Sequence, residues 1–163
     1  MSTLLRQSAG PHALPKAPTR HADDLYTWVE EQVAHLRAGR ADALDLANIA
    51  EELNDVGLSE YYRLQSAVEI VLVHMLKWDH QPERRGRGWA LSITEHRERV
   101  GIVLRKSPGL KSSLAEAQEN AFRLARLRAA REMRRPVEAL PDACPYAWDD
   151  ILNRPFDLDS VKR

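Results

Sequence analysis

Residues 59–82 read SEYYRLQSAVEIVLVHMLKWDHQP, and this stretch decides the fold of the chain. Its apolar residues recur every three to four positions, the spacing that places side chains on one face of an α-helix. Ile70 and Val73 add a second apolar face, and a helix that is apolar on most sides is expected at the centre of a domain. Pro82 ends the predicted helix, because proline disfavours helical geometry in the residue before it. The main apolar face consists of Tyr61, Leu64, Val68, Val71, Leu72, Met75 and Trp78.

Helical patterns also flank this central stretch on both sides. Asp23 is a suitable N-cap for a first helix, and Gly39 and Gly57 mark the ends of the first and second helices. The further helices are predicted over residues 23–39, 42–57, 89–104, 107–134 and, in a short form, 146–152. No segment alternates with a period of two residues, so no sheet is expected. The sequence therefore predicts an all-α fold, an antiparallel bundle of about five longer helices plus a short C-terminal helix.

Length and composition favour a single domain. Residues 1–22 contain three prolines and no apolar periodicity, so we interpret them as a flexible N-terminal tail. Residues 23–163 are then expected to form one helical domain. No stretch approaches the roughly 18 apolar residues of a membrane span, and the single cysteine, Cys144, leaves no internal disulfide. We therefore expect a cytoplasmic protein that has no membrane partner.

The charges of the chain are segregated along the sequence, although their sum is zero. Residues 23–60 carry a net charge of −8, and residues 61–135 carry +8. Two interpretations stay open. The acidic segment can pack beside the basic segment and neutralise it. Alternatively, the basic segment faces outward and meets an anion or a nucleic acid.

Several motifs that identify enzymes are absent from the sequence. It has no glycine-rich phosphate loop, no dinucleotide-binding fingerprint and no HExxH zinc motif. It also has no Glu-x-x-His pair of the kind that di-iron bundles use. We therefore expect no cofactor and no metal, and Cys144 is interpreted as a small apolar residue rather than a nucleophile.

Three residues are weak candidates for catalysis. His74 lies on the central helix, and Lys77 follows three residues later, so a positive charge near His74 would favour the neutral imidazole of a general base. Glu52 lies near an apolar face, where a carboxylate needs a cation or a hydrogen-bond donor. Each residue also has a structural interpretation, as a hydrogen-bonded core histidine or as a partner in an ion pair. We expect Glu51 or Glu52 to pair with a cation from residues 74–97.

The loop that follows the central helix is the strongest candidate for an anion site. Arg84, Arg85, Arg87 and Trp89 lie close together in the stretch QPERRGRGW, at the predicted start of the next helix. The dipole at a helix N-terminus favours negative charge. The alternative is a structural corner in which the arginines bond carbonyl groups at the end of the central helix. We also expect Trp78 and Trp89 to pack near each other across this loop.

A set of spaced residues resembles the DUF29 family, a family of small bacterial proteins of unknown function. The resemblance covers about residues 23–155 and implies an all-helical fold, but it implies no reaction. Gly88 departs from the family pattern, in which serine is frequent, so a hydroxyl that could cap a helix or touch a ligand is missing. The matching residues are Arg37, Gly39, Arg40, Leu44, Asp45, Asn48, Ile49, Ala50, Glu51, Glu52, Ser59, His74, Leu76, Lys77, Trp78, Gln81, Pro82, Arg85, Trp89, Arg97, Ser107, Pro108, Cys144, Pro145 and Tyr146.

Two functional hypotheses follow from the sequence. The first is a non-enzymatic interaction or regulatory module that binds a protein or a nucleic acid, supported by the charge segregation and the missing catalytic motifs. The second is a small enzyme or anion-binding protein with a site at the end of the central helix. That site would use Glu52, His74, Lys77, Arg85 and Trp89. The sequence leaves the oligomeric state undetermined.

Overall fold

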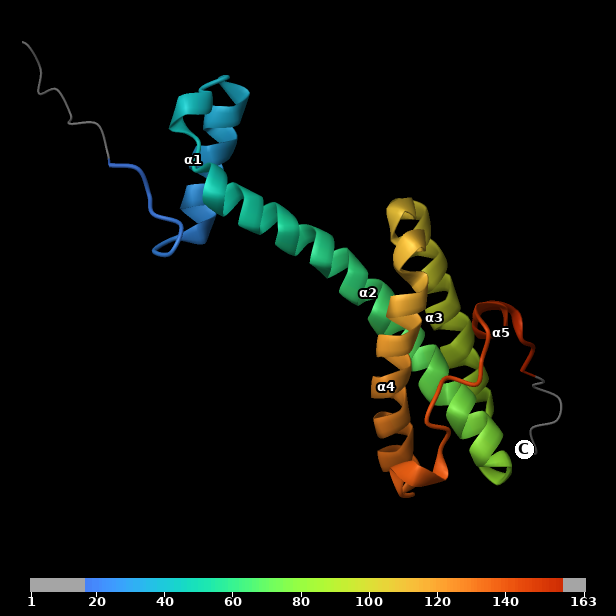
Figure 1. Ribbon diagram of the computed structural model, residues 1–163. Coiled ribbons are helices and arrows are strands. Elements are labelled where there is room, and N and C mark those ends of the chain that lie inside the picture. Colours follow the sequence, from blue (N-terminus) through green and yellow to red (C-terminus); the bar gives the residue numbers. More distant parts are fainter. Residues whose placement is uncertain (1–16, 157–163) are drawn as a thin grey trace, which may run out of the picture. The chain divides into compact units, whose positions relative to one another are not determined.

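The computed structural model describes residues 17–156, which form helices and connecting turns without a strand (Figure 1). The all-α prediction is therefore confirmed for this part of the chain. The α-helices are α1 (Leu25–Arg37), α2 (Leu46–His80), α3 (Arg87–Lys106), α4 (Leu114–Met133) and α5 (Trp148–Asn153). Short 3-10 helices lie at η1 (Ala41–Ala43), η2 (Pro82–Arg84), η3 (Pro108–Ser113) and η4 (Val137–Ala139).

The chain divides into two compact units, residues 1–53 (unit 1) and residues 54–163 (unit 2). This boundary differs from the one expected between a tail and a helical domain, and the single domain over residues 23–163 stays a prediction. Residues 1–16 of the expected tail lie outside the described residues. Thr19 and His21, which were also assigned to the tail, belong to unit 1 and are hydrogen-bonded there to Glu31 and Glu52.

In unit 1 the side chain of Trp28 on α1 is buried, and its ring meets the ring of His21 edge to face. Asp24, rather than the predicted Asp23, caps α1 and accepts a hydrogen bond from the backbone N–H of Thr27 at 3.0 Å. Gln32 is also buried, and its Oε1 accepts the backbone N–H of Asp45 at 2.9 Å. This bond fixes the turn that leads into α2.

Unit 2 has its core where the second half of α2 packs with α3 and α4 (Figure 1). The predicted apolar face of α2 is confirmed, since its side chains from Leu64 to Trp78 are at most 6% exposed at the core positions. Ala117, Ala121 and Ala125 recur every four residues on α4 and are fully buried. Small side chains at this spacing let the backbone of α4 approach its neighbours closely.

The predicted break at Gly57 is wrong, because residues 42–57 and 59–82 contribute to a single helix. α2 has 35 residues and runs through Gly57 without interruption. A glycine in a helix interior costs about 1 kcal/mol relative to alanine, and a long helix that is packed at one end tolerates this cost. Residues 17–156 therefore form four long α-helices and one short α-helix, rather than about five long helices and one short helix.

Replacing Gly57 by alanine is expected to stabilise the protein by about 1 kcal/mol. Gly57 has helical geometry, and an added Cβ would find no atom within 4 Å. The free energy of unfolding measured by urea denaturation should rise accordingly. Gly39→Ala is the control, because Gly39 has φ +66°, a conformation that alanine adopts only with strain, and this variant should lose stability. A Gly57→Ala protein that is less stable than the wild type would contradict the prediction.

A C-terminal segment closes one side of unit 2 through the guanidinium group of Arg97. Its three nitrogens donate to the backbone carbonyls of Ile151 at 2.7 Å, Arg154 at 2.9 Å and Asp150 at 3.0 Å. These carbonyls lie at the end of α5, where a helix leaves its last acceptors without partners. Arg97 therefore holds α5 against α3.

Asp79 provides a second attachment for the same segment. Its carboxylate accepts two hydrogen bonds from Arg154, at 2.6 and 2.8 Å, and one from the Tyr146 hydroxyl at 2.9 Å. Burial opposes the ionisation of Asp79, but the bonds from Arg154 and Tyr146 outweigh it, so the pKa of Asp79 lies below its ordinary value. The carboxylate is therefore ionised at neutral pH and links α2 to residues 146–154.

Candidate functional site

The residues predicted to form a site at the end of α2 do not all lie in the same unit. Glu52 belongs to unit 1 and precedes His74 on α2 by about six helical turns. Its Oε1 lies 2.7 Å from Nε2 of His21, whose ring also meets the ring of Trp28 edge to face. Among the described residues, no ion pair joins Glu51 or Glu52 to residues 74–97, so the predicted pairing with a cation from that region is wrong.

His74, Lys77 and Trp89 do come together near the end of α2. Nζ of Lys77 lies 2.8 Å from a carboxylate oxygen of Glu132 and 4.7 Å from the centre of the Trp89 ring. The His74 ring lies 6.5 Å from the Trp89 ring. Because the amine of Lys77 is held by an anion and an aromatic face, these contacts favour a structural role for it.

His74 is held in its neutral form. Burial, and to a smaller extent the nearby positive charge of Lys77, lower the pKa of His74 to about 4. Nδ1 of His74 is buried and has no hydrogen-bond partner among the described residues. A neutral imidazole is the form that a general base requires, but it is also what burial alone produces. A catalytic role for His74 stays a prediction.

Of the arginines in the loop after α2, one fits the structural corner and two are left as candidates for an anion site. Nε of Arg85 donates to the carbonyl oxygen of Trp78 at 2.8 Å, and its guanidinium lies 5.5 Å from the Trp78 ring centre. Arg85 thus caps the end of α2, as the structural interpretation expects. Arg84 and Arg87 are exposed, and within residues 17–156 the guanidinium group of neither one makes a hydrogen bond or an ion pair. The first turn of α3 has no acidic residue, so an anion site at Arg84 and Arg87 stays a prediction.

Trp78 and Trp89 do not make the expected ring contact. Trp78 packs edge to face with Phe156, at 5.2 Å between the ring centres, while Trp89 meets His74 and Lys77. No ring contact between the two tryptophans occurs among the described residues. The loop after α2 therefore joins two separate aromatic clusters.

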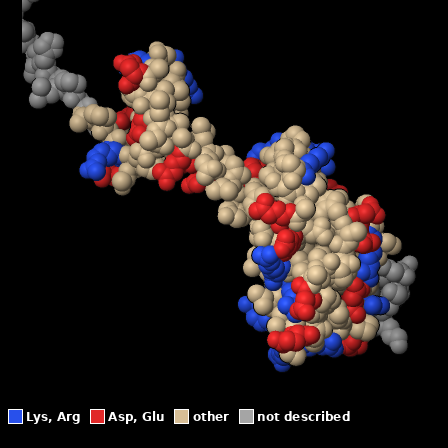
Figure 2. Space-filling view, viewed as in Figure 1, with Lys and Arg blue, Asp and Glu red and all other residues tan. Residues whose placement is uncertain are grey.

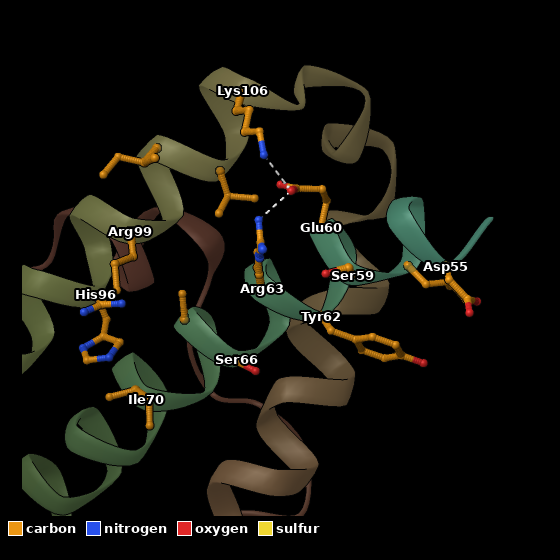
Figure 3. Close-up of a pocket in the computed structure, with 14 residues that line it drawn as sticks. Asp55, Ser59, Glu60, Tyr62, Arg63, Ser66, Ile70, His96, Arg99 and Lys106 are labelled. Carbon is orange, nitrogen blue, oxygen red and sulfur yellow. Dashed lines mark hydrogen bonds and ion pairs between the residues drawn. The ribbon is translucent and has the colours of Figure 1, made fainter. Parts of the chain in front are cut away.

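A groove of about 1000 Å³ opens elsewhere in unit 2, between residues 55–70 of α2 and residues 96–106 of α3 (Figure 3). Three large apolar side chains are exposed along it: Leu58 at 41%, Tyr62 at 56% and Ile102 at 55%. Its lining also includes Ala67, Ile70 and Val103, which are buried or half-buried. The hollow is therefore an apolar surface with an open side.

The helical repeat explains why these side chains meet. Leu58, Tyr62 and Ile70 are separated by four and eight residues, so they lie along one side of α2. Ile102 and Val103 contribute the facing side of α3. This side of α2 is not the one that packs in the core, so Leu58 and Tyr62 stay exposed and Ile70 is only half-buried.

One end of the groove is charged, as the dashed contacts of Figure 3 show. Oε1 of Glu60 accepts hydrogen bonds from Nη1 of Arg63 at 2.7 Å and from Nζ of Lys106 at 2.8 Å. The bond from Lys106 contributes most to lowering the pKa of Glu60, so the carboxylate is ionised at neutral pH. Two cations thus share one carboxylate oxygen. The other oxygen, Oε2, is buried without a hydrogen-bond partner among the described residues.

Sequence reasoning missed this groove, because no motif marks it. The available signal was a weak one: Leu58 and Tyr62 lie four residues apart and off the main apolar face of the predicted central helix. Such a pair is ordinarily interpreted as scattered surface apolar residues. Only the positions of α2 and α3 show that Ile102 lines the same hollow as Leu58 and Tyr62.

These features define an all-α protein that exposes an apolar groove between two of its helices. Within residues 17–156, no helix is both long and apolar enough to cross a membrane. Residues 21–157 match the family model described as domain of unknown function DUF29, and the chain belongs to this family. The resemblance expected from the sequence is thus confirmed. Searches of curated proteins and of solved structures found no match.

Proposed function

We propose that this protein is a non-enzymatic interaction module, and that its unit 2 binds a helix of another protein in the groove between α2 and α3. The observation that carries this proposal is the exposure of Leu58, Tyr62 and Ile102 around one open hollow. Scattered apolar residues are normal on a protein surface, but a group of them in a groove is typical of interaction sites.

The dimensions of the groove suit a helix. Its α2 side extends over residues 55–70, which corresponds to about 22 Å of helix, or about four turns. Neighbouring helices pack about 8–10 Å apart, and a third helix between α2 and α3 would cover Leu58, Tyr62 and Ile102 together. The second half of α2 already packs with α3 and α4, so the added helix would extend unit 2 into a four-helix arrangement. Binding of an amphipathic helix in a groove is a frequent recognition mode.

A nucleic acid is a less suitable occupant than a protein. Phosphate binding needs unpaired lysine and arginine side chains, whereas three of the arginines on α4 already face carboxylates. The pairs are Arg123 with Glu119, Arg126 with Asp142, and Arg128 with Glu69 and Glu132. On the face of unit 2 drawn in Figure 2, basic and acidic side chains are interspersed rather than gathered in a field of one sign.

Tyr62→Glu is expected to abolish binding at the groove. A displayed library of four-turn helical peptides, selected on the full-length protein, should yield binders, and their affinity for Tyr62→Glu should fall by at least about 30-fold. The physical reason is that a bound helix would bury the new carboxylate against Leu58 and Ile102 without a partner. Fluorescence anisotropy of the selected peptides measures the loss.

Leu91→Glu is the matched control for this experiment. Leu91 is an exposed apolar residue on α3, at 57%, and it does not line the groove. This variant should bind the selected peptides as the wild type does, and circular dichroism should show that both variants keep their helices. A library without binders, or binders that tolerate Tyr62→Glu, would overturn the proposal.

A further inference from the structure

We infer that the groove selects an acidic amphipathic helix, whose carboxylates meet Arg63 and Lys106 while its apolar face covers Tyr62 and Ile102. This inference rests on the proposed function and adds the chemistry of the partner. Three observations support it. They are the exposure of the charged side chains near Glu60, the N–H donors that these side chains keep free, and the positions of the other charges along the groove.

At this end of the groove, the two cationic side chains are more exposed to solvent than the carboxylate that binds them. The side chains of Arg63 and Lys106 are 61% and 63% exposed, whereas the side chain of Glu60 is 16% exposed. In Figure 3, Lys106 reaches Glu60 from α3, and Arg63 reaches it from α2. A helix that enters the groove therefore meets two positive charges before it meets the negative one.

Both cations keep hydrogen-bond donors for a further acceptor. Arginine has five N–H donors and lysine has three. Among the described residues, the only side-chain hydrogen bond of Arg63 and the only one of Lys106 go to the same oxygen, Oε1 of Glu60. A carboxylate on the partner can accept from both groups without displacing Glu60, and it would offset the remaining positive charge.

The second acidic residue of the groove, Asp55, balances this surplus in the sum of the charges, but it lies apart from Arg63 and Lys106 along the groove, so the positive charge there is a local one. Arg99 is paired with Glu95 on its own helix, at 2.7 Å, so that pair is neutral overall. Asp55 lies on α2 more than a turn before Glu60. A basic partner helix would be attracted only near Asp55 and repelled at Arg63 and Lys106. Covering the apolar lining excludes water, which strengthens the attraction and the repulsion alike.

The test uses two labelled four-turn helical peptides with the same leucine stripe, one flanked by glutamate and the other by lysine. With the full-length protein at low salt, the glutamate peptide should bind at least about tenfold more tightly, and high salt should reduce this preference. In Lys106→Glu the preference should disappear or reverse. Lys111→Glu is the matched control, because it changes the net charge equally at an exposed lysine outside the groove, and it should keep the preference.

The possible outcomes separate this inference from the proposed function. If both peptides bind equally and Tyr62→Glu loses both, the groove binds helices, but the acidic partner is wrong. If both bind Tyr62→Glu as they bind the wild type, or if neither binds, the proposed function itself fails. A peptide-free dimer in sedimentation experiments that Tyr62→Glu dissociates would place a second copy of the chain in the groove and overturn both. Tight binding of an RNA or DNA oligonucleotide that both peptides displace would also overturn both.

Discussion

Replacing Arg97 by alanine is expected to lower the free energy of unfolding of unit 2 by about 3 kcal/mol. A hydrogen bond from a charged donor contributes about 1.5–3 kcal/mol net, and Arg97 makes three such bonds to the end of α5. The three contributions do not add fully, because the freed carbonyl groups regain water when α5 moves away. The loss should fall mainly on the attachment of the C-terminal segment.

Urea denaturation followed by circular dichroism measures this loss, and hydrogen exchange locates it. The backbone amides of α5 should exchange faster in the variant than in the wild type. The amides of the α2 core should exchange faster only by the amount that the lower overall stability accounts for. Arg99→Ala is the control. Arg99 lies two residues further along α3 and is exposed, and its one ion pair within residues 17–156 is with Glu95, so its loss should cost less than about 1 kcal/mol. Equal losses for the two variants would show that the bonds to α5 do not hold the segment.

Acid is expected to destabilise the protein through His74, by up to about 3 kcal/mol. The pKa of His74 is about 4 in the folded protein, mainly because of burial, against an ordinary value of 6.5 in the unfolded chain. Between these values the unfolded chain binds a proton at this position that the folded protein does not bind. The contribution of His74 to stability is therefore complete above about pH 6.5 and is lost as the pH falls to about 4.

The measurement compares the wild type with His74→Gln by urea denaturation, from about pH 7 to about pH 4. Glutamine is not ionised, so the difference between the two unfolding free energies isolates the proton uptake at residue 74. As the pH falls, the wild type should lose more of its unfolding free energy than the His74→Gln variant loses. The charged groups around His74, namely Lys77, Glu132, His96 and Arg128, are present in both proteins. A difference that stays constant across this range would contradict the assigned cause.

The helices were predictable from the sequence to the extent that apolar periodicity determines them. The buried face of α2, from Leu64 to Trp78, follows directly from the spacing of its apolar residues. The break at Gly57 was predicted wrongly, because the low helix propensity of glycine was expected to end the helix. Its cost of about 1 kcal/mol is small beside the packing of the second half of α2.

The candidate site was less predictable, because it depends on contacts between residues that are distant in sequence. The partner of Glu52 proved to be His21, which carries no helical pattern and was assigned to the tail. Arg85 and Arg97 belong to the residues that resemble the family pattern. Their hydrogen-bond acceptors are backbone carbonyl groups, and no sequence motif indicates which carbonyls an arginine will bind. The groove depends on the placement of α3 beside α2, which brings Ile102 and Tyr62 into the lining of one hollow.

The uninterrupted course of α2 has a consequence for cleavage of the chain. Residues 53–59 are all exposed, and Gly57 lies among them, so this part of the helix gains little from side-chain packing. It can open locally at small cost, and an opened, exposed segment is what a protease needs for cutting. Residues 1–53 and 54–163 would be separated by a cut near residue 54, which leaves the internal contacts of each unit in place.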